Sequence, residues 1–175
     1  MGSGGQHSGT ELVTALGLQM LPVEGIWFRE TWRGSAPEPG APAAGTAIYG
    51  LITDDPQSFS AMHVLGTDEI WHFYSGDPLD MLLLYPDGTH ATVVLGPDVL
   101  AGHVPQVVVP AGVWMGADLV EGGRYCLFGT TMAPGFTPEQ FLNGALEDLA
   151  ATWPAARVHL ARLCRADAPA RMPDL

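Results

Sequence analysis

The chain repeats short runs in which hydrophobic and polar residues alternate, and glycine, proline or aspartate stands between the runs. Such alternation is typical of β-strands, because successive side chains of a strand point to opposite faces of a sheet. Strands are predicted at residues 25–33, 46–53, 80–85, 89–95, 104–109, 113–120 and 124–132, with two more inside 60–78. Strands at this short spacing indicate a sandwich or a barrel, so the predicted fold class is dominated by β-structure.

The stretch 60–78 predicts two strands joined by a tight turn at residues 66–68. Alternation predicts which side chains share a face: His63 with Leu65 on the first strand, and Glu69 with Trp71 and Phe73 on the second. A buried histidine and a buried carboxyl group would then converge across the turn.

Helical spacing occurs only near the two ends of the chain. Thr10 predicts the cap of a short helix that runs to Leu16. The capping-box sequence 137–140 predicts the start of a second helix, and residues 155–164 predict a third. The last two helices are expected to pack on the outside of the barrel.

A single domain is expected over residues 10–165, because 175 residues suit one core of ordinary size. Residues 1–9 are rich in glycine and serine and predict a flexible tail, and residues 166–175 predict a frayed C-terminus. Residues 34–45 have prolines and glycines without an apolar period, which predicts a loop. This loop is either a lid over the mouth of the barrel or a surface insertion.

The composition restricts the possible partners of the chain. It has seven arginines and no lysine against 19 acidic residues, so its formal net charge is −12. This charge argues against nucleic acids and anionic membrane surfaces, and it favours a small molecule or a second copy of the chain. The sequence has no apolar stretch long enough to span a bilayer and no signal-like start, which predicts a soluble, cytoplasmic protein.

Two motifs resemble those of the cupin superfamily. His63, Glu69 and Gly76 have the spacing of the first cupin motif, but Leu65 replaces its second histidine. Residues 110–115 resemble the second motif, with Met115 where a histidine ligand belongs. More narrowly, five runs are similar to an uncharacterised cupin family labelled predicted sugar epimerases: Phe28–Arg33, Thr46–Tyr49, Asp68–Pro78, Val109–Trp114 and Ala133–Phe136. The resemblance implies a jelly-roll barrel, a small-molecule substrate and a homodimer.

Glu69 and His63 are the main catalytic candidates, because a carboxyl group in an apolar barrel has a raised pKa and a histidine can share its proton. His72 is a third candidate, although alternation directs it away from Glu69 unless a bulge intervenes. The substrate-binding candidates are Arg29, Tyr49, Trp71, Phe73, Trp114 and Met115. The aromatic residues among them also suit a core position, and Arg29 also suits an ion pair with Glu30.

The resemblance implies a metal site of three histidines and one glutamate, of which this chain keeps only His63 and Glu69. Leucine cannot ligate a metal, and the soft thioether of methionine does not suit a hard divalent ion. His72 could complete a two-histidine, one-carboxylate set only through a bulge. The sequence therefore predicts no metal and no other cofactor, with a divalent metal as the alternative.

Three functions remain open. The first is proton transfer beside a carbonyl group, as in an isomerase, an epimerase or a cyclase that acts on a small molecule. The second is a barrel that binds a small molecule without catalysis. The third is a metal-dependent oxygenase, which would carry a bound metal ion.

Overall fold

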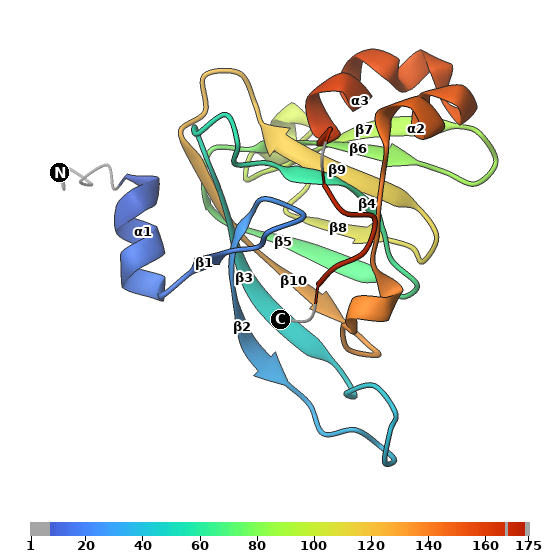
Figure 1. Ribbon diagram of the computed structural model, residues 1–175. Helices are drawn as coiled ribbons and strands as arrows, with labels where there is room; N and C mark the ends of the chain where they lie inside the picture. Colours follow the sequence, from blue (N-terminus) through green and yellow to red (C-terminus); the bar gives the residue numbers. More distant parts are fainter. Residues whose placement is uncertain (1–7, 167, 174–175) are drawn as a thin grey trace, which may run out of the picture.

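Two antiparallel sheets face each other across the core in the computed structural model, which describes residues 8–166 and 168–173 (Figure 1). The first sheet has six strands, in the order β1 (Gln19–Met20), β2 (Trp27–Arg33), β3 (Thr46–Thr53), β10 (Tyr125–Met132), β5 (Glu69–Gly76) and β8 (Gln106–Val109). The second has five, in the order β11 (Leu142–Asn143), β4 (Ser60–Val64), β9 (Trp114–Leu119), β6 (Leu79–Leu84) and β7 (His90–Leu95). The predicted fold class, mostly β with a jelly-roll arrangement, is confirmed.

The predicted hairpin within 60–78 is wrong, because its two strands belong to different sheets. β4 pairs with β9 and β11, whereas β5 pairs with β10 and β8. The turn at residues 66–68 carries the chain from one sheet to the other, and each strand finds partners that are distant in sequence. His63 and Glu69 therefore come from opposite sheets.

The N-cap of the N-terminal helix α1 (Gly9–Leu16) lies two residues earlier than predicted. Ser8, not Thr10, is the N-cap, and it forms a capping box with Glu11. Gly17 ends the helix with a φ of 62°, a left-handed conformation that glycine adopts without a steric cost. Residues 1–7 of the predicted tail lie outside the described residues.

The predicted helix after Thr137 is replaced by three short elements. A 3₁₀ turn, η2 (Pro138–Gln140), leads into β11, and the helix α2 (Leu146–Thr152) begins later. The Thr137 side chain makes no capping hydrogen bond. Phe141 is buried in the core between the sheets, which holds this part of the chain extended.

Two helices cover the outer face of the five-stranded sheet, as predicted (Figure 1). They are α2 and α3 (Arg157–Leu163), joined by the turn η3 (Pro154–Ala156); a further turn, η1 (Val99–Ala101), lies between β7 and β8. Their apolar side chains pack with those of the sheet in one cluster, which includes Met62, Leu82, Leu84, Leu149, Trp153 and Leu160. This side of the sheet is therefore a second core rather than a binding surface.

The C-terminal segment, residues 168–173, returns from α3 toward the space between the two sheets (Figure 1). The carbonyl oxygen of Ala170 accepts a hydrogen bond from the Asn143 amide at 2.9 Å. Arg171 donates to the carbonyl oxygen of Glu139 at 3.0 Å, and Met172 is buried in the core with 6% of its surface exposed. The sequence predicted a frayed end here, whereas the structure gives these residues specific contacts.

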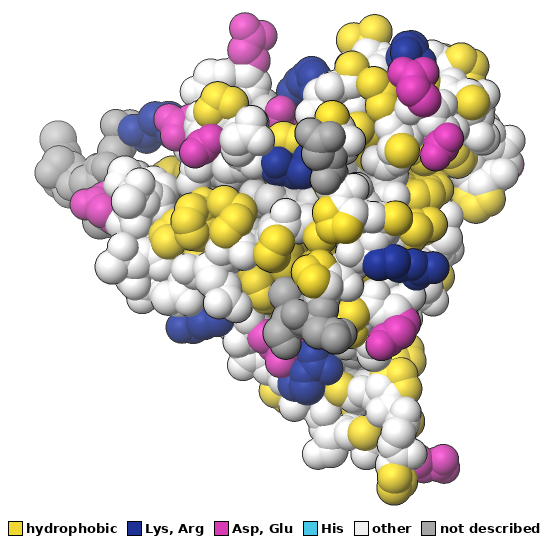
Figure 2. Space-filling view, viewed as in Figure 1, with side chains coloured by type: hydrophobic (Ala, Val, Ile, Leu, Met, Phe, Trp, Pro, Cys, Tyr) yellow, Lys and Arg dark blue, Asp and Glu magenta, His cyan; other side chains and the backbone are white. Residues whose placement is uncertain are grey.

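Among the described residues, no helix covers the outer face of β5 and β8 in the six-stranded sheet, where Tyr74 and Val108 are exposed (Figure 1). On the face shown in Figure 2, hydrophobic side chains gather around β1 and the C-terminal segment, with charged groups of both signs around them. The homodimer stays a prediction.

Within the described residues, no helix is long and apolar enough to cross a membrane.

Met172→Ala is expected to lower the free energy of unfolding by about 2–4 kcal/mol, because truncation of a buried methionine loses its burial and leaves a cavity. Urea unfolding measures the effect. Met20→Ala is the matched control, since Met20 is 38% exposed, and it should change the stability by less than about 1 kcal/mol. Equal small effects for both variants would show that the C-terminal segment does not pack on the core in solution.

Candidate functional site

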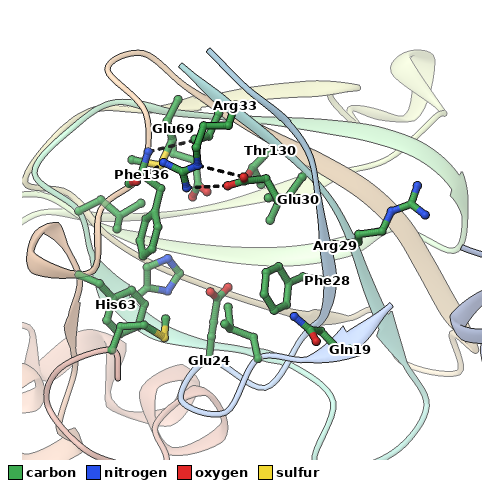
Figure 3. Close-up of a pocket in the computed structure, with 17 residues that line it drawn as sticks. Gln19, Glu24, Phe28, Arg29, Glu30, Arg33, His63, Glu69, Thr130 and Phe136 are labelled. Carbon is green, nitrogen blue, oxygen red and sulfur yellow. Dashed lines mark hydrogen bonds and ion pairs between the residues drawn. The ribbon is translucent and has the colours of Figure 1, made fainter. Parts of the chain in front are cut away.

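A cavity of about 460 Å³ lies between the two sheets, within the size range of small-molecule sites. Its walls are mostly apolar, and a few polar side chains converge in it (Figure 3). The polar groups include Glu24, His63, Glu69 and Thr130, and the apolar ones include Phe28, Phe136, Phe141 and Met172. Such an arrangement suits an apolar ligand body that is oriented by a small number of hydrogen bonds.

Glu69 enters the cavity from the start of β5 and is 7% exposed. Trp71, two residues further on the same face, donates its indole N–H to Oε2 of Glu69 at 2.8 Å, and the Thr130 hydroxyl is a second hydrogen-bond partner. Burial raises the pKa of the Glu69 carboxyl group above its usual value, and the attraction of His63 opposes this rise only in part. The group can therefore hold its proton at a higher pH than an exposed glutamate.

His63 enters the same cavity from β4 and is 2% exposed. Its Nδ1 lies 2.7 Å from the carbonyl oxygen of Ala61, which can only accept a hydrogen bond, so Nδ1 carries a proton. In the neutral ring, Nε2 is then the atom that can accept a proton from a ligand. The ring stacks on Phe141 with 5.0 Å between centroids, which fixes its orientation.

Glu24 is a further acidic side chain of the cavity, and the sequence pattern did not reveal it. It lies between β1 and β2, is 7% exposed, and accepts a hydrogen bond on Oε1 from the Ser60 hydroxyl at 2.6 Å. Glu24 belongs to no periodic element, so the only signal in the sequence was the glycine that follows it. In the structure this glycine, Gly25, has a φ of 93°.

An ion pair between Arg33 and Glu30 stands at the edge of the cavity, with 2.6 Å between Nη2 and Oε2 (Figure 3). A bulge in β2 after Glu30 puts both side chains on the cavity side. Arg29, the predicted anion-binding residue, borders the cavity, but its guanidinium points away and lies 5.5 Å from the ring centroid of Tyr49. Of the neighbouring residues Arg29 and Glu30, it is therefore Glu30 whose side chain lies on the cavity side.

Three of the predicted site residues lie away from the cavity. The ring of His72 contacts the Thr131 hydroxyl at 3.0 Å and the Gln106 side chain at 3.1 Å, as its parity in the strand predicts. Tyr49 packs edge-on against Tyr74, and Trp114 packs in the cluster under α2 and α3. These positions do not bring the three residues to Glu69 and His63.

Trp71, Phe73 and Met115 belong to the apolar core between the sheets and do not line the cavity. Trp71 still acts on the site, because its indole binds Glu69. The indole stacks on Phe128 with 4.7 Å between centroids. The Phe128 ring occupies the space beside Gly50 of β3, where a Cβ atom would overlap it.

The loop 34–45 contributes no lining residue, so a lid role for it finds no support in the cavity wall. The C-terminal part of the chain contributes three residues to the cavity wall: Phe136, Phe141 and Met172. The sequence did not connect these residues with the site, because they lie far from it along the chain.

The residues do not fit the metal site that the cupin resemblance implies. Leu65 lines the cavity and Met115 is buried in the core at the positions where histidine ligands would stand. Within residues 8–166 and 168–173, no group of three or more His, Cys, Asp or Glu side chains is placed to hold a metal ion. No step of the chemistry below uses a metal.

Two sheets packed as a jelly roll, with a ligand-sized cavity between them, are the architecture of cupin barrels and of several other protein classes. The chain belongs to the family described as Cupin superfamily (DUF985), whose model matches residues 10–143. No functionally curated protein matches the sequence.

The solved structures agree with this family assignment. A crystal structure of a Shewanella oneidensis protein is 30% identical, with a TM-score of 0.84, and the match covers 93% of this chain and all of that one. A hypothetical protein from Leishmania major is 25% identical, with a TM-score of 0.80 over 90% of this chain and 99% of that one. Bacillus subtilis oxalate decarboxylase is 12% identical with a TM-score of 0.52, covering 87% of this chain and 38% of that one, which shows the fold alone. The narrower label of predicted sugar epimerase is not confirmed by these matches.

Glu69→Gln is expected to change how stability depends on pH. Below the usual glutamate pKa of 4.5, the carboxyl group is protonated in both the folded and the unfolded chain. Above it, the unfolded chain releases the proton while the buried group keeps it, so the free energy of unfolding of the wild type falls relative to that of the variant. The fall is at most about 1.4 kcal/mol per pH unit and ends at the folded-state pKa.

Urea unfolding of both proteins between about pH 4 and pH 8 measures this difference. Glu121→Gln, at an exposed position, is the control and should follow the wild type at every pH. Parallel curves for the wild type and Glu69→Gln would contradict a raised pKa at Glu69.

Proposed function

We propose that this cupin catalyses proton transfer beside a carbonyl group of a small molecule, in an isomerisation, epimerisation or cyclisation. The observation that carries the proposal is the presence of two complementary groups in one apolar cavity. Glu69 has a raised pKa and is held by Trp71, and His63 has its Nε2 available to a ligand. A proton donor and a proton acceptor on facing walls of one cavity are what this chemistry requires.

The proposed reaction moves one proton away from carbon and one toward oxygen. Nε2 of His63 removes the proton next to the carbonyl group, while the protonated Glu69 donates its proton to the carbonyl oxygen. The resulting enol has the same number of atoms and electrons as the substrate. Return of the His63 proton to the opposite face of the same carbon, with loss of the enol O–H proton to Glu69, gives the epimer. Where that carbon also carries a hydroxyl group, return of the His63 proton to the former carbonyl carbon, with loss of that hydroxyl proton to Glu69, gives the isomer. In both cases the two side chains recover their starting protonation.

The walls of the cavity support this chemistry by excluding water. Phe28, Phe136 and Phe141 surround the polar groups with apolar surface, where electrostatic interactions are stronger than in water. The Ala61 carbonyl fixes the tautomer of His63, and the Trp71 indole fixes the position of the Glu69 carboxyl group. Both groups are therefore preorganised for a ligand that lies between the sheets.

Glu69→Gln is expected to lower turnover by about 10²–10⁴, because the amide cannot donate the proton that general acid catalysis requires. The substrate for the assay is identified by mass spectrometry of compounds that co-purify with the protein. Gln keeps the size of the side chain and an oxygen acceptor for Trp71, so the fold is retained. Glu121→Gln is the control and should leave turnover unchanged.

A barrel that binds a small molecule without catalysis is the second candidate function. Leu65 and Met115, at positions where other cupins hold a metal, favour it, because the cavity has kept its shape without those ligands. This candidate predicts tight binding with no turnover, in the wild type as in Glu69→Gln. Turnover of the variant within about threefold of the wild type would contradict the acid role of Glu69.

The purified protein is expected to contain clearly less than one metal ion per chain, because His63 and Glu69 alone do not make up a ligand set for a divalent metal. Elemental analysis after dialysis measures this content. Stoichiometric iron, zinc or nickel would contradict the expectation and favour the oxygenase.

A further inference from the structure

Glu24 is a buried acid of the cavity that takes no part in the proposed proton transfer between His63, Glu69 and the substrate. The Ser60 hydroxyl donates a hydrogen bond to Oε1 of Glu24 at 2.6 Å. Figure 3 shows the carboxyl group of Glu24 directed into the cavity. A carboxyl group at the wall of a cavity can accept a hydrogen bond from a donor on a ligand.

The backbone at Glu24 is held in place from behind. Its carbonyl oxygen accepts hydrogen bonds from the Ala61 amide at 3.0 Å and from the Arg165 side chain at 3.4 Å. Arg165 itself lies 4.0 Å from the centroid of the Phe59 ring and is not one of the residues that line the cavity. The position of the carboxyl group is thus built into the fold rather than set by a flexible side chain alone.

The charged groups around the cavity disfavour an anionic ligand. Glu24 and Glu30 are acidic residues of the wall in addition to the proton donor Glu69. Arg33 is already bound to Glu30 through Nε and Nη2, at 3.0 and 2.6 Å. The guanidinium of Arg29 points away toward Tyr49, so neither arginine of the wall offers an anion an unpaired partner within the cavity.

The aromatic side chains of the cavity also favour a cationic ligand. Phe28 and Phe136 line the same cavity as Glu24, and Phe141 stacks on His63. The face of an aromatic ring carries negative electrostatic potential and attracts a cation, most strongly where water is excluded. A buried carboxyl group together with phenyl rings is a combination that recognises a substituted ammonium group.

We propose that the cavity selects an organic amine, with its ammonium group at Glu24 and its apolar body against Phe28 and Phe136. This inference rests on the proposed function only in taking the same cavity as the ligand site. It names a substrate class for the reaction: an amine that also carries a carbonyl group within reach of Glu69 and His63. The negative charge of the whole chain attracts such a cation from solution.

The test compares three probes with the same phenyl body: 2-phenylethylamine, 2-phenylethanol and 3-phenylpropanoate. Calorimetric titration of the full-length protein at pH 7 should show the amine bound at least about tenfold more tightly than the alcohol, and the carboxylate bound most weakly. Glu24→Gln should reduce the affinity for the amine to that for the alcohol. Glu121→Gln should leave the order unchanged.

Failure of the amine to bind at millimolar concentration would overturn the inference, as would carboxylate binding as tight as that of the amine. An intact amine preference in folded Glu24→Gln would also overturn it. Should that variant not fold, the order of the three probes on the wild-type protein decides. Glu69→Gln separates this inference from the proposed function, because it should lose turnover and keep the preference for the amine.

Discussion

Burial of the Glu69 carboxyl group between two β-sheets is the constraint on which the site depends. An acid in an apolar environment is costly unless its oxygens find donors, and here the Trp71 indole and the Thr130 hydroxyl serve this purpose. Both partners come from the six-stranded sheet, Trp71 from β5 and Thr130 from the neighbouring β10. The pairing of these strands therefore fixes the position of the acid and supplies both of these hydrogen-bond partners.

The second sheet supplies the complementary group. β4 passes directly into β5 at a turn that changes sheets, so residues six apart in sequence face each other across the cavity. A hairpin would have put His63 and Glu69 on one sheet, side by side. The observed crossover leaves space between them for the ligand-sized cavity in the interior of the jelly roll.

Sequence periodicity predicted the strands well, because alternation is a local property that each strand carries in its own residues. It also predicted that Glu69 shares a face with Trp71, and that His72 opposes them. It could not predict Glu24 or Met172, which lie outside regular strands and reach the cavity only through long-range packing. Trp114 and Met115 do not line the cavity: Trp114 packs in the cluster under α2 and α3, and Met115 packs in the core beside His63, a difference that motif spacing does not show.

The contact between Gly50 and Phe128 links the backbone of β3 to the acid through a row of stacked groups. Gly50 leaves room for Phe128, Phe128 supports the Trp71 indole, and that indole holds Glu69. None of the first three residues lines the cavity. In evolutionary terms, the acidity of the site can be retuned by substitutions that never touch a ligand, so relatives with identical cavity walls can differ in their chemistry.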